Sequence, residues 1–408
     1  MLRKARGLSK FCVRGSGCNP SGMASKQTRV DPFVALLDDE ALAELRRRLS
    51  TSRRPAPVAA GWEQGVEPNW LDELLRDWTR FDVTGFQQTL TRLPHFIAEI
   101  GNSTIHFVHM PGRGPDPMPL LLTHGWPGSF LEYLPVIAAL TDPEAHGGNA
   151  ADAFTVVVPS LPGFGFSGPP PPGGASADDV AGLWDRLMND GLGYPRYAAH
   201  GSDLGAGITA RLARAHPEHI AGIHLATPGL PAAPKPPLTA AEARYLEAAA
   251  TWVGEEGGYA HQHSTKPATL ATALSDSPAG LAAWIGEKVA TWSSMRDDGS
   301  PAFDRELLLG TLTLYWTTNT IGTSLLPYWS GRHLPVSDLA EGTRSPVPTA
   351  VSIFGGERIP FPKPPREMVA RYFNLVRWAE YDRGGHFPAV AEPQLLVDVL
   401  RATFRRVR

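Results

Sequence analysis

Cysteine is scarce in this chain of 408 residues, and its two examples, Cys12 and Cys18, both lie close to the amino terminus. The rest of the sequence therefore holds no thiol for a disulfide or for a thiolate metal site. This usage is typical of a reducing compartment, and we expect a cytoplasmic protein without structural disulfides.

The chain also lacks long apolar runs and a strong charge of either sign. No stretch approaches the roughly 18 apolar residues needed to cross a bilayer, so we expect no integral membrane anchor. The formal net charge is only -3, and no long basic run follows the first residues, which argues against a general nucleic-acid-binding protein. With 42% hydrophobic residues, a chain of this length can instead bury a large core.

Residues 1–27 differ in composition from everything that follows. They contain several basic side chains and no acidic one, with too few apolar residues to fold, which predicts a disordered basic extension. A signal peptide is excluded because no apolar core follows the basic residues. A transit peptide and an over-long start ahead of Met23 both remain open.

Helix-forming composition dominates residues 28–95. Residues 69–75 (NWLDELL) show an amphipathic helical face, and a loop rich in proline and glycine over residues 53–68 precedes them. This region is too thin to enclose a core of its own. We therefore predict a helical belt that packs on a larger domain through its Trp and Phe side chains.

Strand-like runs then alternate with helical stretches at the spacing of α/β proteins. Continuous apolar runs such as 119–123 (PLLLT) are what strands buried on both faces require. The alternation covers residues 96–228 and resumes over 346–408, which predicts an α/β fold with a mostly parallel sheet and helices on both faces. Between these parts, residues 229–345 open with a proline-rich hinge at 231–237 and continue as aromatic, helix-like segments, which predicts an inserted helical lid.

The segment 200–205 (HGSDLG) has the layout of a nucleophile elbow, the sharp strand-to-helix turn of the α/β-hydrolase fold. Small residues must lie two positions before and after the nucleophile, because the strand and the helix approach closely there. Gly201 and Gly205 supply that pair and place Asp203 at the centre. A serine nucleophile at Ser202 would put two bulky residues at the tight positions, and a helix-capping role for Asp203 is the other alternative.

Two residues near the carboxyl terminus fall where that fold places the partners of the nucleophile. His386 follows the last strand-like run between glycines and Phe387, as the histidine does in the chain order nucleophile, acid, histidine. Glu357 follows the strand-like run that ends at residue 354, where the acid that orients the histidine belongs. Asp382 is closer to His386 in sequence but too close to reach back round the ring.

The segment 124–129 (HGWPGS) follows a strand-like run and precedes a helical one. Loops at this position direct a backbone N–H toward the elbow, and together with the N–H of Leu204 this loop would bind a developing oxyanion. A tight glycine turn that only caps the next helix is the alternative interpretation.

The predicted lid contributes two tyrosines in the segments 258–259 (GY) and 327–329 (PYW). Either phenol could donate a hydrogen bond to a leaving oxygen above the nucleophile, whereas aromatic packing is the default role of a single tyrosine. Tyr315 is a third candidate, but its neighbours indicate the buried side of a helix.

These motifs together resemble the microsomal-type epoxide hydrolases. The resemblance rests on 124–129 (HGWPGS), 201–205 (GSDLG), 258–259 (GY) and 385–388 (GHFP), and it runs from about residue 31 to the end. It implies a set of roles: nucleophile Asp203, base His386 oriented by Glu357, lid acids Tyr259 and Tyr328, oxyanion donors Trp126 and Leu204, and substrate contacts His124, Trp126 and Phe387.

The resemblance also implies the reaction. An apolar epoxide and water would give a vicinal diol through an aspartyl ester, with no metal or organic cofactor, in detoxification or in catabolism of compounds such as aromatic hydrocarbons. Leu204 stands where members of that family often have Trp, which alters the floor of the pocket. A homo-oligomer is compatible with the sequence.

Two other functions remain as alternatives. A dehalogenase would form the same aspartyl ester but would expel halide, which leaves without a proton. The lid phenols, which can donate a proton, favour epoxide hydrolysis instead. So does Leu204, because a dehalogenase often has Trp there, whose indole N–H binds the halide. A non-catalytic, ligand-binding protein of this fold is the alternative from another class. Such proteins usually lack one of the catalytic residues, and this chain has all three.

Overall fold

The computed structural model describes residues 28–56, 61–229, 235–335 and 344–408. The predicted extension over residues 1–27, with both cysteines, lies outside the described residues, as does part of the proline-rich hinge. Within the described ranges, no helix combines the length and the apolar character that crossing a membrane requires.

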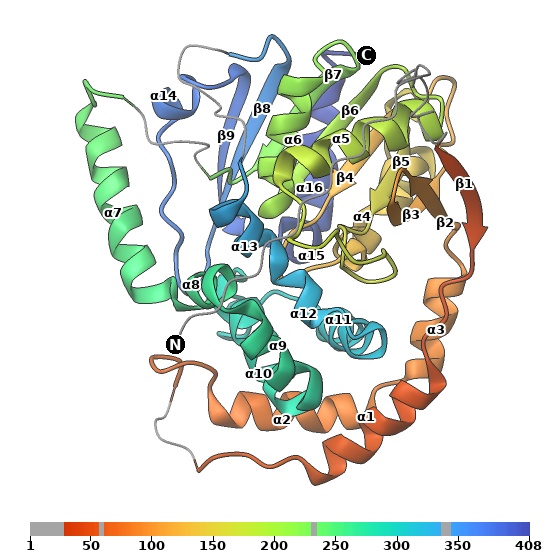
Figure 1. Ribbon diagram of the computed structural model, residues 1–408. Coiled ribbons are helices and arrows are strands. Elements are labelled where there is room, and N and C mark those ends of the chain that lie inside the picture. The colour runs from red at the N-terminus through yellow and green to blue at the C-terminus, as the bar shows by residue number, and fades with distance from the viewer. Residues whose placement is uncertain (1–27, 57–60, 230–234, 336–343) are drawn as a thin grey trace, which may run out of the picture.

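The described residues form a nine-stranded sheet, which lies in the upper part of the molecule in the view of Figure 1. Its strands are β1 (Arg29–Phe33), β2 (His95–Ile100), β3 (Ser103–Met110), β4 (Met118–Thr123), β5 (Phe154–Pro159), β6 (Tyr197–Ser202), β7 (Ile220–Ala226), β8 (Pro348–Gly355) and β9 (Asn374–Gly384). They lie in the order β1-β2-β3-β5-β4-β6-β7-β8-β9. The pairs from β1 to β5 are antiparallel and all pairs from β5 to β9 are parallel, which confirms the mostly parallel sheet.

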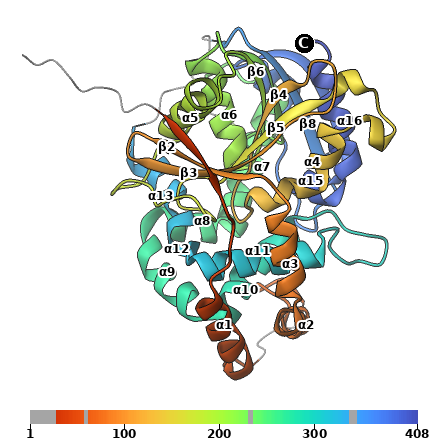
Figure 2. The ribbon, with the colours of Figure 1, turned by 90° about the vertical axis from the view of Figure 1, so that its right-hand side faces the viewer.

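Continuous apolar runs make the central strands suitable for burial on both faces. β5 and β7 are buried along their whole length because helices cover the sheet on both sides. Helices α5 (Ala177–Arg186) and α6 (Leu204–Ala215) lie on one face, and α4 (Leu134–Thr141) and α16 (Pro393–Phe404) lie on the other (Figure 2). Two short helices, α14 (Arg366–Val369) and α15 (Pro388–Ala391), complete the second half of the core.

The region of residues 28–95 is not purely helical, which corrects our prediction. β1 pairs antiparallel with β2, from Arg29 opposite Glu99 to Phe33 opposite His95, and adds an edge strand to the sheet. Its sequence, RVDPF, is short, largely exposed and interrupted by Pro32, a combination that only an edge strand tolerates. Pairing with a distant segment, rather than a local pattern, therefore creates this strand.

The predicted helical lid is inserted between β7 and β8 and lies below the sheet in Figure 1. Its helices are α7 (Ala240–Glu256), α8 (Gly258–Thr265), α9 (Pro267–Asp276), α10 (Pro278–Trp292), α11 (Arg305–Thr318), α12 (Ile321–Ser324) and α13 (Leu326–His333). A lid at this place in the chain faces the carboxyl ends of the parallel strands, where ligands bind in sheets of this kind.

The belt helices hold the lid from outside. Helices α1 (Asp39–Thr51) and α2 (Pro68–Arg80) run beneath the lid, and α3 (Val83–Thr91) leads back to the sheet (Figure 1). The Trp78 indole N–H donates to Thr313 Oγ1 at 2.9 Å. A Cβ added at Gly286 would lie 2.9 Å from the Trp70 ring, so α2 and α10 pack in close contact.

Candidate active site

Asp203 lies in the turn between β6 and α6, where the backbone is strained. Its φ of 51° and ψ of -124° are unusual for a residue with a side chain. A Cβ added at Gly201 would lie 2.1 Å from Gly205 O, and one added at Gly205 would lie 2.0 Å from Thr123 O. Both flanking positions therefore require glycine, and they centre the turn on Asp203 rather than on Ser202.

The two carboxylate oxygens of Asp203 have different partners. Oδ1 accepts a hydrogen bond from the backbone N–H of Trp126 at 2.8 Å, and Oδ2 lies 3.2 Å from Nε2 of His386. The Asp203 and His386 side chains are only 18% and 12% exposed, so the pair is largely shielded from water. A Cβ added at Gly125 would lie 2.2 Å from Oδ1, which explains the glycine before Trp126.

His386 is held at the end of β9 by backbone turns and by aromatic contacts. Gly384 and Gly385 both have positive φ, 99° and 56°, so the chain reverses sharply ahead of the histidine. The backbone N–H of His386 donates to the backbone carbonyl of Trp292 at 2.9 Å. The centre of the imidazole ring lies 5.0 Å from that of the Trp292 ring and 4.9 Å from that of the Phe361 ring. Because Trp292 ends α10, the lid itself fixes the position of the imidazole.

Glu357 follows β8 as expected, but its carboxylate is directed elsewhere. It is 2% exposed and accepts a hydrogen bond from Lys363 Nζ at 3.2 Å. Among the described residues its carboxylate makes no hydrogen bond to His386, while the rejected candidate Asp382 is exposed. The structure thus brings Asp203 and His386 together and leaves the orienting role of Glu357 a prediction.

The two lid tyrosines lie close together over the Trp126 loop. Their ring centres are 5.8 Å apart, and Tyr259 stacks on Trp126 at 5.5 Å with an interplanar angle of 11°. Burial raises the pKa of both the Tyr259 and Tyr328 hydroxyls, and the negative charge of Asp203 raises each pKa further. Both phenols therefore stay protonated at neutral pH and remain hydrogen-bond donors near the carboxylate.

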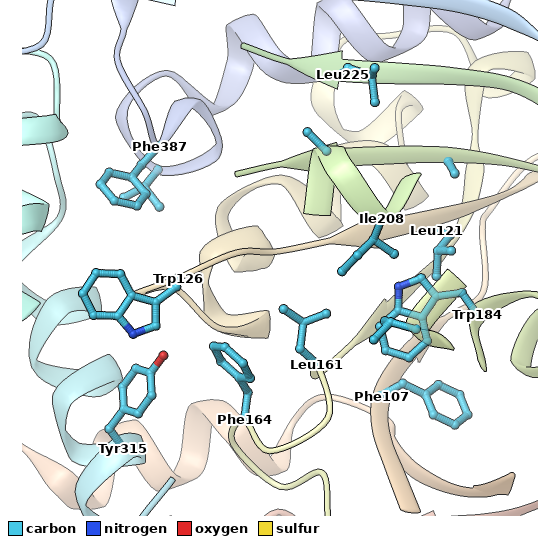
Figure 3. Packing of buried hydrophobic residues seen from close by; sticks show 14 of the residues in the cluster. Phe107, Leu121, Trp126, Leu161, Phe164, Trp184, Ile208, Leu225, Tyr315 and Phe387 are labelled. Carbon is cyan, nitrogen blue, oxygen red and sulfur yellow. The ribbon is translucent and has the colours of Figure 1, made fainter. Parts of the chain in front are cut away.

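Tyr315, the third candidate, is buried in the hydrophobic core. Its hydroxyl donates to Gly128 O at 3.0 Å, and its ring lies 6.4 Å from that of Phe164. Figure 3 shows Tyr315 and Phe164 gathered with Trp126 in one hydrophobic cluster. This hydroxyl therefore helps to hold the 124–129 loop in place.

A cavity of about 310 Å³ opens beside the nucleophile. It is lined by Asp203 and Leu204, by further residues of α6 and by Leu326 and Pro327 of α13, and most of the lining is apolar. Its size and its polarity suit a small apolar molecule held against the carboxylate.

The expected substrate contacts His124, Trp126 and Phe387 do not line this cavity, and their contact with a substrate stays a prediction. His124 is fully buried: its Nδ1–H donates to Gly125 O at 3.0 Å, and its Nε2 accepts from the Leu161 N–H at 3.2 Å. Burial lowers the pKa of His124 to about 4, so the ring is neutral. Both ring nitrogens are hydrogen-bonded to backbone groups, so the ring helps to hold the shape of the loop.

Sequence reasoning missed Glu132, a buried acid close to the nucleophile. Ser202 Oγ donates to Glu132 Oε1 at 3.3 Å, and both side chains are buried. Burial and, second, the charge of Asp203 raise the pKa of Glu132 to about 8. The only signal in the sequence is an acid three residues after Ser129, which is ordinary for the first turn of a helix.

The Glu132→Gln variant should change how stability depends on pH. Because the folded pKa of about 8 lies above the ordinary value of 4.5, the folded state retains a proton that the unfolded state releases. This group therefore contributes stability fully below about pH 4.5, and the contribution is lost as pH rises toward 8. We expect the free energy of unfolding of the variant, relative to wild type, to increase over this range in urea titrations. Parallel pH profiles for the two proteins would contradict a protonated Glu132.

His263 is a second residue that the sequence did not reveal. It is fully buried in α8, its Nε2 accepts from the Trp284 indole N–H at 3.0 Å, and its ring centre lies 4.9 Å from that of Tyr328. Burial lowers the pKa of His263 to about 3, so the imidazole is neutral and supports the phenols without adding charge.

One group of residues has the donor atoms for a metal ion. Asp185, His216 and His219 place three ligand atoms within 4.8 Å of one another. Both histidines already contact the carboxylate of Asp185: His219 Nδ1 lies 2.8 Å from Oδ1, and His216 Nδ1 lies 3.3 Å from Oδ2. His219 precedes β7, at the opposite end of the parallel strands from the elbow, so this group takes no part in the chemistry at Asp203.

Known proteins share this arrangement in sequence and in structure. A family model described as the epoxide hydrolase N terminus matches residues 30–133, and one for the alpha/beta hydrolase fold matches residues 118–257. The chain is 33% identical to epoxide hydrolase 1 of Oryctolagus cuniculus, over 94% of this chain and 90% of that relative.

Two solved structures extend the similarity. The epoxide hydrolase of Aspergillus niger superimposes with a TM-score of 0.80 at 30% identity, covering 93% of this chain and 96% of that one. The juvenile hormone epoxide hydrolase of the silkworm Bombyx mori gives a TM-score of 0.77 at 29% identity, covering 94% and 95%. The similarity thus includes the belt and the lid as well as the sheet.

Proposed function

The chain belongs to the epoxide hydrolases of the alpha/beta hydrolase fold, and from this membership we propose that it works through a covalent ester on Asp203. One observation carries the proposal: the two oxygens of this carboxylate are held differently, Oδ1 by the Trp126 N–H and Oδ2 beside His386. A carboxylate with one oxygen fixed and the other directed at a base is suited to nucleophilic attack.

In the first step, Asp203 Oδ2 attacks a carbon of the oxirane, and the bond from that carbon to the ring oxygen breaks. The ring oxygen would leave as an alkoxide, which is strongly basic, so it needs a proton donor. Tyr259 and Tyr328 fill this role in our proposal because both are protonated and lie over the Trp126 loop. The result is an ester between Asp203 and the opened substrate.

In the second step, His386 Nε2 takes a proton from water, and the hydroxide attacks the carbonyl carbon of the ester. The tetrahedral intermediate carries its negative charge on Oδ1, where the Trp126 N–H already donates and where the Leu204 N–H at the start of α6 would add a second donor. Collapse of the intermediate releases the diol, whose oxygen takes the proton back from His386. The proton left on the Asp203 carboxyl returns to the tyrosinate formed in the first step, which restores the enzyme. These steps require no metal or organic cofactor.

The expectations about cellular context belong to the same proposal. A cytoplasmic enzyme that detoxifies or catabolises apolar epoxides agrees with the cysteine usage, and the largely apolar cavity beside Asp203 supports an apolar substrate. These points rest on composition and on the lining of the cavity.

Single turnover in water labelled with heavy oxygen tests the ester mechanism. Excess enzyme should convert styrene oxide to its diol with unlabelled oxygen, because the first oxygen delivered to the substrate comes from Asp203 and the label enters the carboxylate. Repeated turnover should then release labelled diol. Labelled diol in the first turnover would instead mean direct attack by water and would refute the ester.

A further inference from the structure

The cavity beside Asp203 contains a second charged group. Arg211 lines the same cavity, and among the described residues around it Asp203 and Arg211 are the only charged ones. The remaining lining consists of aliphatic side chains, prolines, glycines and Phe373. An apolar channel with an anion at one point and a cation at another can orient a ligand that is not uniformly apolar.

Helix geometry sets the distance between the two charges. Leu204, Ile208 and Arg211 follow one another at spacings of four and three residues, so they share one face of α6. Seven residues rise about 10 Å along a helix. Arg211 Nη1 donates to Gly207 O at 3.2 Å, so the side chain folds back by as much as one turn. The guanidinium therefore lies one to two turns, about 5 to 10 Å, beyond the nucleophile end of α6.

The protein satisfies this guanidinium only in part. The Arg211 side chain is 13% exposed and forms an ion pair with Asp178, whose Oδ1 lies 3.4 Å from Nε, but this Nε makes no hydrogen bond among the described residues. Arg214 adds a second positive charge one turn further along, and within the described part of the chain it forms no ion pair. Burial lowers the pKa of Arg211, which reflects the cost of holding its charge away from water.

We propose that this cavity takes epoxides that carry a carboxylate, with the oxirane at Asp203 and the carboxylate on the guanidinium of Arg211. The inference rests on the proposed function, because it names the substrate class of the same site. An extended chain of about five to nine atoms spans the separation. The apolar lining covers this chain, and the forked N–H groups of arginine match the two oxygens of a carboxylate.

The test compares a pair of substrates that differ in one charge. Epoxyundecanoic acid with a terminal oxirane and its methyl ester have the same chain and the same reacting ring. We expect wild-type full-length protein to prefer the acid by about tenfold in kcat/KM, the effect of one charge-assisted hydrogen bond. The Arg211→Gln variant should lower this ratio to about one, and Arg211→Lys should retain part of it. Because both substrates are measured with the same enzyme preparation, any loss of folded protein cancels in the ratio of the two kcat/KM values.

Arg214→Gln is the matched control, since it removes the same charge from the same helix but does not line the cavity. It should keep the preference for the acid. A wild-type ratio near one, a preference that survives Arg211→Gln, or an equal loss in Arg214→Gln would overturn the inference. If wild type hydrolyses neither probe nor styrene oxide, the proposed function fails instead, so the two failures are distinguishable.

Discussion

The His386→Gln variant should accumulate a stable adduct of styrene oxide on Asp203. Ring opening requires the carboxylate and the lid phenols, which this substitution leaves in place, whereas ester hydrolysis requires a base for water. Glutamine cannot act as that base at neutral pH. We therefore expect steady-state turnover to fall by about 10²–10⁴-fold while the first step continues.

Intact-mass measurement checks this prediction directly. The protein should gain the mass of one styrene oxide, and peptide mapping should place the gain on the peptide that contains Asp203. Asp203→Asn is the matched control because it keeps the size of the side chain and removes the nucleophile, and it should show no adduct. An unmodified spectrum for His386→Gln beside an active wild type, or an adduct on another residue, would count against the ester.

The elbow could be predicted from sequence because its constraint is local. Gly201 faces Gly205 O at a distance that excludes any Cβ, and the same holds for Gly205 against Thr123 O. The contact between Gly201 and Gly205 lies within the elbow itself, so the spacing of the two glycines already indicates Asp203 as the centre, whereas Thr123 belongs to the neighbouring strand β4. The mostly parallel sheet was predictable for a similar reason, since continuous apolar runs report burial on both faces.

The electrostatic surroundings of the site were not predictable, because they arise from tertiary packing. Glu132 is an ordinary acid in the sequence, and its raised pKa comes from burial and from the charge of Asp203. The two residues are far apart in the chain, Glu132 in a short 3-10 helix and Asp203 in the turn before α6. The position of Glu357 after β8 was predictable, but the direction of its carboxylate, toward Lys363, was not. Sequence order places a residue at the end of a strand and leaves its rotamer open.

Simultaneous replacement of Tyr259 and Tyr328 by Phe should nearly abolish ring opening. With both hydroxyls removed, the ring oxygen must leave without a donor, and the loss of general acid assistance is expected to slow the step by about 10²–10⁴-fold. Each single variant should lose less, because the two rings lie 5.8 Å apart and one phenol remains. Burial raises the pKa of both hydroxyls, so neither should ionise below pH 10 and the rate of ring opening should not fall on that account.

The measurement is cleanest in the His386→Gln background, where the rate of adduct formation reports the first step alone. Tyr315→Phe provides the matched control: it removes a third lid hydroxyl that is bonded to Gly128 O, so it should reduce stability and leave the rate of adduct formation within a few-fold. Equal rates with and without the Tyr259 and Tyr328 hydroxyls would reject them as proton donors while leaving Asp203 as the nucleophile. A loss in Tyr315→Phe as large as in the double variant would show that packing of the lid, rather than the phenol protons, controls ring opening.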